Sequence, residues 1–285
     1  MTKRRTDFSV IGYWSEVKLD IIRDYASVYS RILTAQERPR LEHVYIDAFA
    51  GSGIHLAKDT GDLVWGSATN VLLVDPPFRE YHLIDLDRGN VETLRTMVES
   101  RGSGPYDPDA VHLYNADCND VLLAEVFPRV LYENYRRALC LLDPYGLHLD
   151  WSVIYTAGQM QSVEIFLNFP ILDMNRNVLL RDPRKADPKQ ILRMTRYWGD
   201  ESWRSAGYSS QGNLFGDEEK TNNLRVVNAF RERLKNVAGF AYVPDAMAMK
   251  NSRGATVYYL VFAAQKPVAA KIVRDIFRKH GNRRG

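Results

Sequence analysis

Four short apolar segments in this sequence are each followed by an acidic residue. The segments cover residues 44–46, 81–84, 110–114 and 138–142, and the acids are Asp47, Asp85, Asp117 and Asp143. Such runs are typical of buried strands, and the carboxyl ends of parallel strands meet at one edge of a sheet, where ligands bind. Carboxylates there can accept hydrogen bonds from hydroxyl and amino groups. The pattern therefore predicts a nucleoside-binding site at this edge.

A glycine-rich turn follows the first acid. Gly51 and Gly53 allow a sharp turn and close approach of the backbone to a ligand. A dinucleotide fingerprint requires a third glycine, and none stands at the required position here. The spacing Asp47-x-x-x-Gly51-x-Gly53 instead resembles the first motif of S-adenosylmethionine (SAM) methyltransferases. The resemblance implies that Asp47 holds the charged methionine end of the cofactor and that Phe49, Gly51, Ser52 and Gly53 belong to the loop beneath it. The alternative is a turn without a ligand.

The acids after the second and third segments match further parts of a nucleoside site. Asp85 can accept hydrogen bonds from both hydroxyls of a ribose, and Asp87 is the alternative ligand. Asp117, which precedes Cys118, stands where an adenine amino group would be met. The alternative is that Asp117 or Asn119 only caps the helix that follows.

The fourth segment ends in Asp143-Pro144-Tyr145-Gly146. This turn resembles the (Asp/Asn/Ser)-Pro-Pro-(Tyr/Phe/Trp) motif of methyltransferases that act on amino groups of bases, with one proline in place of two. The resemblance implies that Asp143 and the backbone near Pro144 hold an exocyclic amine, while Tyr145 stacks on the base. No protein partner for Asp143 is evident from the sequence, so its position is best explained by a donor on the acceptor, such as an exocyclic amine. The alternative is a turn with no role in catalysis.

The elements that position these residues alternate between strand and helix. We expect seven strands. The first five alternate with helices, and the last two (240–249 and 255–264) form an antiparallel hairpin. The helix that would normally follow the glycine turn is expected to begin near Ser67, after an insertion at residues 54–66. This predicts an α/β, Rossmann-like class I methyltransferase fold with a mostly parallel sheet and helices on both faces. We expect one domain. It begins with a helix at 14–33, capped by Ser15. A cofactor-binding core follows at 43–170, then a basic helical insertion at 171–239, and then a C-terminal hairpin and helix at 240–280.

Composition excludes several classes of protein. The 285 residues contain no apolar run of the ~20 residues that a membrane span needs, and no signal segment follows the N-terminal basic residues, so we expect a cytoplasmic protein without membrane contact. Cys118 and Cys140 lack the spacing of metal ligands, and the histidines are scattered. We expect no metal.

Charge is unevenly distributed along the chain. Residues 1–150 contain 16 Lys and Arg against 23 Asp and Glu, whereas residues 151–285 contain 22 against 12. The basic residues of the insertion are Arg176, Arg181, Arg184, Lys185, Lys189, Arg193 and Arg196, close to the aromatic Tyr197, Trp198 and Trp203. Cations that contact phosphates and rings that stack on bases predict a nucleic-acid surface, RNA or DNA, in this half. The alternative is a solvated face.

Beyond the fold, several ordered motifs are similar to those of the three-Cys-motif partner protein family. They are Tyr45-Ile46-Asp47-x-Phe49-Ala50-Gly51-x-Gly53, Gly66-Ser67, Leu142-Asp143-Pro144-Tyr145-Gly146-Leu147 and Tyr258-Tyr259-Leu260-x-Phe262-Ala263. The resemblance covers residues 14–277 and implies a methyltransferase-like protein associated with a cysteine-motif companion. We therefore expect a SAM-dependent methyltransferase that modifies a nitrogen of a nucleic-acid base. The alternative is a SAM-binding, non-catalytic partner subunit that recognises nucleic acid or regulates its companion.

Overall fold

The main sheet of the protein has seven strands. In the computed structural model, which describes residues 8–100, 104–209, 219–251 and 253–281, the strands follow the order β11-β12-β8-β7-β2-β5-β6. Their bounds are β2 (Glu42–Asp47), β5 (Glu80–Ile84), β6 (Val111–Tyr114), β7 (Arg136–Leu142), β8 (Val163–Phe169), β11 (Met247–Lys250) and β12 (Thr256–Ala263). The central strands are apolar and buried on both faces, as expected of a sheet covered by helices.

The strand directions confirm the predicted fold class. β6, β5, β2, β7 and β8 are parallel neighbours, whereas β12 pairs antiparallel with β8 and with β11. This is an α/β, Rossmann-like class I methyltransferase arrangement with an antiparallel C-terminal hairpin. The hairpin is shorter than predicted. Residues 247–250 pair along β12, whereas residues 240–246 of the expected strand 240–249 make one isolated bridge, between Tyr242 and Ala264.

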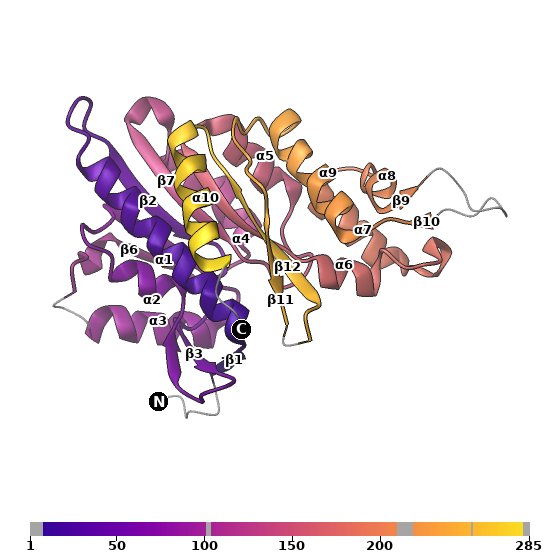
Figure 1. Ribbon diagram of the computed structural model, residues 1–285. Helices are drawn as coiled ribbons and strands as arrows, with labels where there is room; N and C mark the ends of the chain where they lie inside the picture. The colour runs from indigo at the N-terminus through magenta and orange to yellow at the C-terminus, as the bar shows by residue number, and fades with distance from the viewer. Residues whose placement is uncertain (1–7, 101–103, 210–218, 252, 282–285) are drawn as a thin grey trace.

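Helices cover both faces of the sheet (Figure 1). One face carries α1 (Tyr13–Thr34), α2 (Ser67–Leu72), α3 (Arg88–Ser100) and α10 (Pro267–Gly281), and the other carries α4 (Cys118–Val121), α5 (Trp151–Met160) and α9 (Asn223–Asn236). Alternate residues of each strand enter the two cores. Ser15 was predicted to cap α1, but the cap is Gly12, and Ser15 lies within the first turn. Among the described residues, no helix is long and apolar enough to cross a membrane.

The insertion between the glycine turn and α2 is structured. β3 (Ile54–Ala57) and β4 (Leu63–Trp65) form a hairpin, and β1 (Ser9–Ile11) adds to it in parallel, giving a separate three-stranded sheet. Figure 1 shows this small sheet beside the first turn of α1. The N-terminal segment is therefore held next to the glycine turn, which the sequence did not predict.

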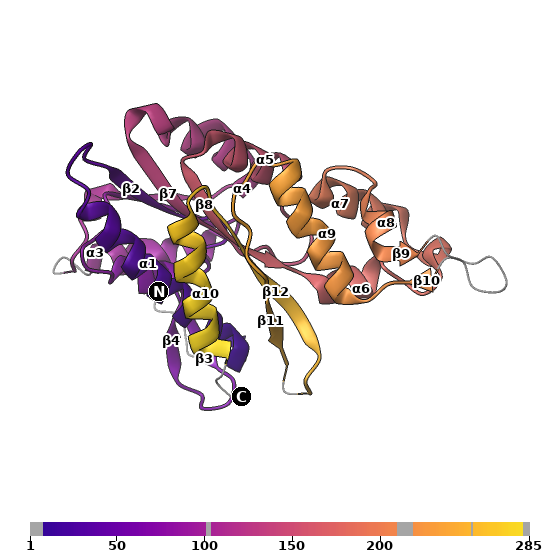
Figure 2. The same ribbon diagram turned by 45° about the horizontal axis from the view of Figure 1, so that its top comes forward.

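A helical lobe follows β8 and extends to one side of the sheet (Figure 2). It contains α6 (Ile171–Asn177), α7 (Pro188–Trp198) and α8 (Trp203–Gly207), with the short pair β9 (Tyr208–Ser209) and β10 (Glu219–Lys220). Tyr197, Trp198 and Trp203 are at most 2% exposed and belong to the core. The prediction that these rings stack on bases is therefore wrong, because they pack in the hydrophobic core between the lobe and the sheet.

Candidate active site

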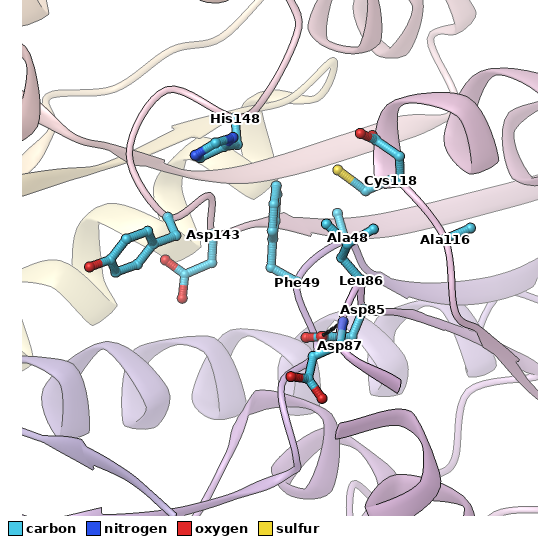
Figure 3. Close-up of a pocket in the computed structure, with 11 residues that line it drawn as sticks. Ala48, Phe49, Asp85, Leu86, Asp87, Ala116, Cys118, Asp143 and His148 are labelled. Carbon is cyan, nitrogen blue, oxygen red and sulfur yellow. Dashed lines mark hydrogen bonds between the residues drawn. The ribbon is translucent and has the colours of Figure 1, made fainter. Parts of the chain in front are cut away.

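The largest group of predicted site residues lines one pocket at the carboxyl edge of the sheet. Its volume is about 630 Å³, within the range of small-molecule sites. The lining residues are Ala48, Phe49, Asp85, Leu86, Asp87, Ala116, Asp117, Cys118, Asp143, Tyr145 and His148. Figure 3 shows Phe49 between Asp143 on one side and Cys118 on the other. Parallel strands β2, β5, β6 and β7 supply the segments, so acids distant in sequence reach one cavity.

Asp85 fastens the glycine turn to the sheet. One carboxylate oxygen accepts a hydrogen bond from Gly51 N at 2.8 Å, and the other accepts from Asp87 N at 2.8 Å and Asn90 Nδ2 at 3.2 Å. Gly51 and Gly53 have φ of 62° and 74°, a region that favours glycine. Asp87 also lines the pocket. Both acids therefore remain candidate ribose ligands.

Asp47 lies beneath the turn and outside the pocket lining. It is fully buried and accepts hydrogen bonds from Ser67 Oγ at 2.6 Å, Tyr45 Oη at 3.2 Å and Phe49 N at 3.3 Å. Burial raises the pKa of Asp47 to about 6, against these hydrogen bonds, which lower it. These contacts show that Asp47 organises the backbone after β2. Four other predicted site residues do not line the pocket among the described residues, namely Gly51, Ser52, Gly53 and Pro144.

Asp117 both caps a helix and lines the pocket. Its Oδ1 accepts hydrogen bonds from Asn119 N at 2.8 Å and Asn119 Nδ2 at 2.9 Å, which confirms the capping alternative. Both bonds end on the same oxygen, so Asp117 can still accept a bond from a ligand. Cys118 is buried, and burial raises the pKa of its thiol to about 12. Cys118 therefore packs against the pocket as a neutral thiol.

Asp143 has two protein partners, neither of which was evident from the sequence. Lys18 Nζ on α1 forms an ion pair with its Oδ2, and Asn168 Nδ2 at the end of β8 donates to its Oδ1 at 2.7 Å. Lys18 is buried, with its ammonium 5.5 Å from the centroid of the Tyr258 ring. Burial alone would lower the pKa of Lys18. The charge and hydrogen bond of Asp143, together with the charges of Tyr258 and Asp47, outweigh burial and raise that pKa.

Two buried polar atoms near this pair lack a hydrogen-bond partner among the described residues. They are Asn168 Oδ1 and His55 Nδ1. Because Asn168 Nδ2 must face the Asp143 carboxylate, its Oδ1 is the remaining acceptor. His55 lies beside the glycine turn, and the charges of Lys18 and Asp143 both act on it. Buried polar atoms are rarely left unpaired, so these two are candidates for ligand contacts.

Three further residues of the site were not predicted from the sequence, namely Lys18, Leu86 and His148. Leu86 is 75% exposed at the pocket and the predicted Tyr145 is 91% exposed, so both offer apolar surface to a ligand. Arg193 Nη2 lies 3.0 Å from His148 Nε2, which joins α7 to the pocket wall. Lys18 did carry a signal, because it shares one helical face with Ile21, Ile22 and Tyr25, where a lysine is unexpected. Leu86 and His148 carried none, whereas Asn168 stands at the end of the fifth predicted strand, the alternative position for an acceptor site.

The residues present fit SAM at this pocket. Asp85 or Asp87 would hold the ribose, Asp117 the adenine amino group, and Leu86 and Phe49 the apolar face of the base. The unpaired His55 Nδ1 beside the turn offers a contact for the methionine end. No cluster of three or more His, Cys, Asp or Glu side chains within the described ranges is arranged to hold a metal ion.

Comparison with known proteins finds only solved structures of low similarity to this chain. No protein-family model matches the sequence, and no curated protein matches it. A Legionella pneumophila protein of the DUF519 family model is 9% identical, with a TM-score of 0.47 and coverage of 92% of this chain and 90% of that one. The methyltransferase domain of bacterial CtHen1 is 11% identical, with a TM-score of 0.44 and coverage of 89% and 100%. A SAM-dependent methyltransferase from Mesorhizobium loti is 14% identical, with a TM-score of 0.37 and coverage of 84% and 97%. At these values the likenesses do not bear on activity or substrate.

Proposed function

We propose that this protein is a SAM-dependent methyltransferase whose acceptor is a nitrogen of a nucleic-acid base. The observation that carries the proposal is the group formed by Asp143 and Asn168 beside the nucleoside pocket. It joins a carboxylate to a buried amide oxygen that has no partner among the described residues. Both atoms accept hydrogen bonds, which suits the two N–H groups of an exocyclic amine.

The chain contributes mainly alignment. Bound SAM would supply an activated methyl group on a positively charged sulfur. Asp143 and Asn168 would orient the amine so that its lone pair points at the methyl carbon. The N–C bond would form as the methyl–sulfur bond breaks, leaving a neutral thioether, and the proton released from the amine would pass to solvent. Lys18 holds the Asp143 carboxylate in place from α1. Tyr145, exposed at the pocket, would stack on the base.

The basic half of the chain supports a nucleic-acid acceptor. Arg193 and Arg196 lie on α7, where one contacts His148 of the pocket and the other pairs with Asp150 just before α5. Four other cations of the lobe have no ion-pair partner among the described residues, namely Arg176, Arg181, Lys185 and Lys189. Phosphate groups next to the pocket would be neutralised by such cations.

One observation favours the non-catalytic alternative. Asp143 is already neutralised by Lys18, and the turn has one proline, so the chain could bind SAM and serve a cysteine-motif companion without transferring methyl groups. Both proposals require SAM binding. Turnover separates them.

The test is methyl transfer from tritium-labelled SAM to total RNA, DNA and protein, with SAM binding measured by calorimetry. The variant pairs Asp143→Leu with Lys18→Met, which removes both charges and keeps apolar volume. We expect label in nucleic acid and a loss of about 100-fold in the double variant, since an interaction important for transfer is gone. The control is Glu164→Gln, a buried carboxyl on β8 that Tyr25 Oη contacts at 2.6 Å. SAM binding without transfer to any fraction would favour the partner subunit, and label only in protein would exclude a base acceptor.

A further inference from the structure

A second cleft lies beside the acceptor turn. It has a volume of about 490 Å³ and is bounded by the first turn of α1, the residues after β3, and the β11–β12 hairpin. The side chains that matter are Tyr13, Trp14, Lys58, Asp59, Lys250 and Tyr258. We call it the Trp14 cleft. It is separate from the nucleoside pocket, with which it shares no lining residue.

Two contacts connect the Trp14 cleft with the acceptor turn. Tyr258 forms part of the cleft wall, and the Lys18 ammonium lies over its ring. Lys18 in turn pairs with Asp143, which lines the first pocket. Tyr258 Oη also donates to Trp14 O at 3.3 Å, which fixes the wall to α1. Two side chains, Tyr258 and Lys18, would therefore separate a ligand in the cleft from the Asp143 carboxylate.

The cleft combines aromatic rings with free cations. Tyr13 and Trp14 are half-buried, with ring centroids 5.5 Å apart at an interplanar angle of 79°, so their faces point in different directions. Lys58 and Lys250 are exposed, and neither has a side-chain partner within the described residues. Rings that stack on bases and lysines that contact phosphates are the elements of a single-stranded nucleic-acid site.

The acidic residue of the cleft, Asp59, could also contact a nucleotide. Asp59 is exposed among the lining residues, and a carboxylate accepts a hydrogen bond from the amino group of a base. A purely acidic ligand would meet Asp59 as a like charge. A nucleotide offers both a phosphate for the lysines and a base edge for Asp59.

We propose that the Trp14 cleft binds a nucleotide of single-stranded nucleic acid that neighbours the base presented to Asp143. The proposal rests on the proposed function, because it places the same acceptor strand. It also moves the stacking surface from the insertion, where Tyr197, Trp198 and Trp203 are buried, to the start of α1. The cations of the lobe would then contact backbone phosphates without stacking.

The test is fluorescence anisotropy with labelled single-stranded RNA and DNA oligonucleotides of about 12 nucleotides. Trp14→Ala should weaken the affinity by about tenfold, because a stacked base is lost, and Trp14→Phe should restore most of it. Lys58→Glu with Lys250→Glu should weaken it at least as much and reduce its salt dependence. The matched control, Lys266→Glu with Lys271→Glu, reverses two exposed charges outside the cleft and the lobe and should have a smaller effect. Circular dichroism and SAM affinity confirm that each variant is folded.

A crosslinking experiment locates the contact directly. A 5-iodouracil oligonucleotide, irradiated with the wild-type protein, should label the peptide that contains Trp14. The inference is overturned if neither oligonucleotide binds, if Trp14→Ala and the lysine pair bind as wild type does, or if the label falls only on the lobe. Oligonucleotide binding that depends on Trp14, without methyl transfer to any fraction, would instead leave the cleft intact and overturn the proposed enzymatic function.

Discussion

The two sides of the pocket hold their carboxylates in different ways. On the proposed cofactor side, Asp85 in the lining and Asp47 beneath it accept hydrogen bonds from neutral donors, chiefly backbone N–H groups and hydroxyls within or next to the glycine turn. On the proposed acceptor side, Asp143 is paired with the ammonium of Lys18, which lies 125 residues earlier in the chain.

The difference shows how each side is assembled. Most donors on the cofactor side come from turns and caps that form as soon as the local backbone does. The acceptor side exists only after α1 has packed against β7, β8 and β12, because its charges come from separate elements. Removing an acid should therefore have different effects on the two sides.

The largest effect is expected for Asp143→Ala. It leaves the Lys18 ammonium buried without its partner, so the free energy of unfolding should fall by about 3 kcal/mol. Chemical denaturation at neutral pH measures the change. In the Lys18→Met background the same substitution should cost much less, because no unpaired charge remains. Equal losses in both backgrounds would mean that the ion pair does not distinguish the acceptor side.

Asp47 provides a pH test of the cofactor side. Its pKa is about 6 in the folded protein against an ordinary value of 3.8. Between these two pH values the folded state therefore holds a proton on Asp47 that the unfolded state has lost. The free energy of unfolding should therefore fall as pH rises from about 4 to about 6 and then stay level with respect to this group.

Asp47→Asn should remove that part of the pH dependence. Relative to wild type, the variant should gain about 2 kcal/mol of stability between pH 4 and pH 7. Glu164→Gln is the matched control, because burial raises the pKa of Glu164 to about 7 and its window extends correspondingly higher. Denaturation curves at several pH values provide the measurement. A pH-independent difference for Asp47→Asn would show that its acid is charged throughout the range.

Asp85→Ala should affect the ligand more than the fold. It removes the acceptor for Gly51 N and a candidate ribose contact, so SAM affinity should weaken by about 1.5 to 2 kcal/mol. Calorimetry with SAM measures this, and Asp87→Ala is the paired variant. If only Asp87→Ala weakens binding, Asp87 is the ribose ligand.

Tyr145→Ala should give the smallest change in stability. The ring is 91% exposed, so the free energy of unfolding should change by less than about 0.5 kcal/mol, while methyl transfer falls and Tyr145→Phe retains most of it. A thermal melt and the tritium assay together check this. A large loss of stability would show that the ring packs against the protein and does not await a base.

Much of this organisation could be predicted from local sequence. The apolar runs predicted the strands at the sheet centre. The pattern Asp-x-x-x-Gly-x-Gly predicted a turn, and that turn requires the positive φ angles that Gly51 and Gly53 adopt. The capping role of Asp117 also followed from its position before a helix. Such features depend on the backbone geometry of a few consecutive residues, and the side chains of those same residues control that geometry.

Burial and pairing could not be predicted in the same way. Trp14 and Trp203 both stand at the start of a helix. Trp14 lines a cleft and Trp203 is 1% exposed, because packing against distant elements decides which rings are covered. Lys18 and Asp143 meet only because α1 crosses the end of β7. The sequence by itself determined the order of the elements, the glycine turn and the acids at the strand ends, since these follow from local conformation. The tertiary structure alone decided which cation reaches Asp143 and which aromatic rings remain free, since both depend on contacts between segments far apart in the chain.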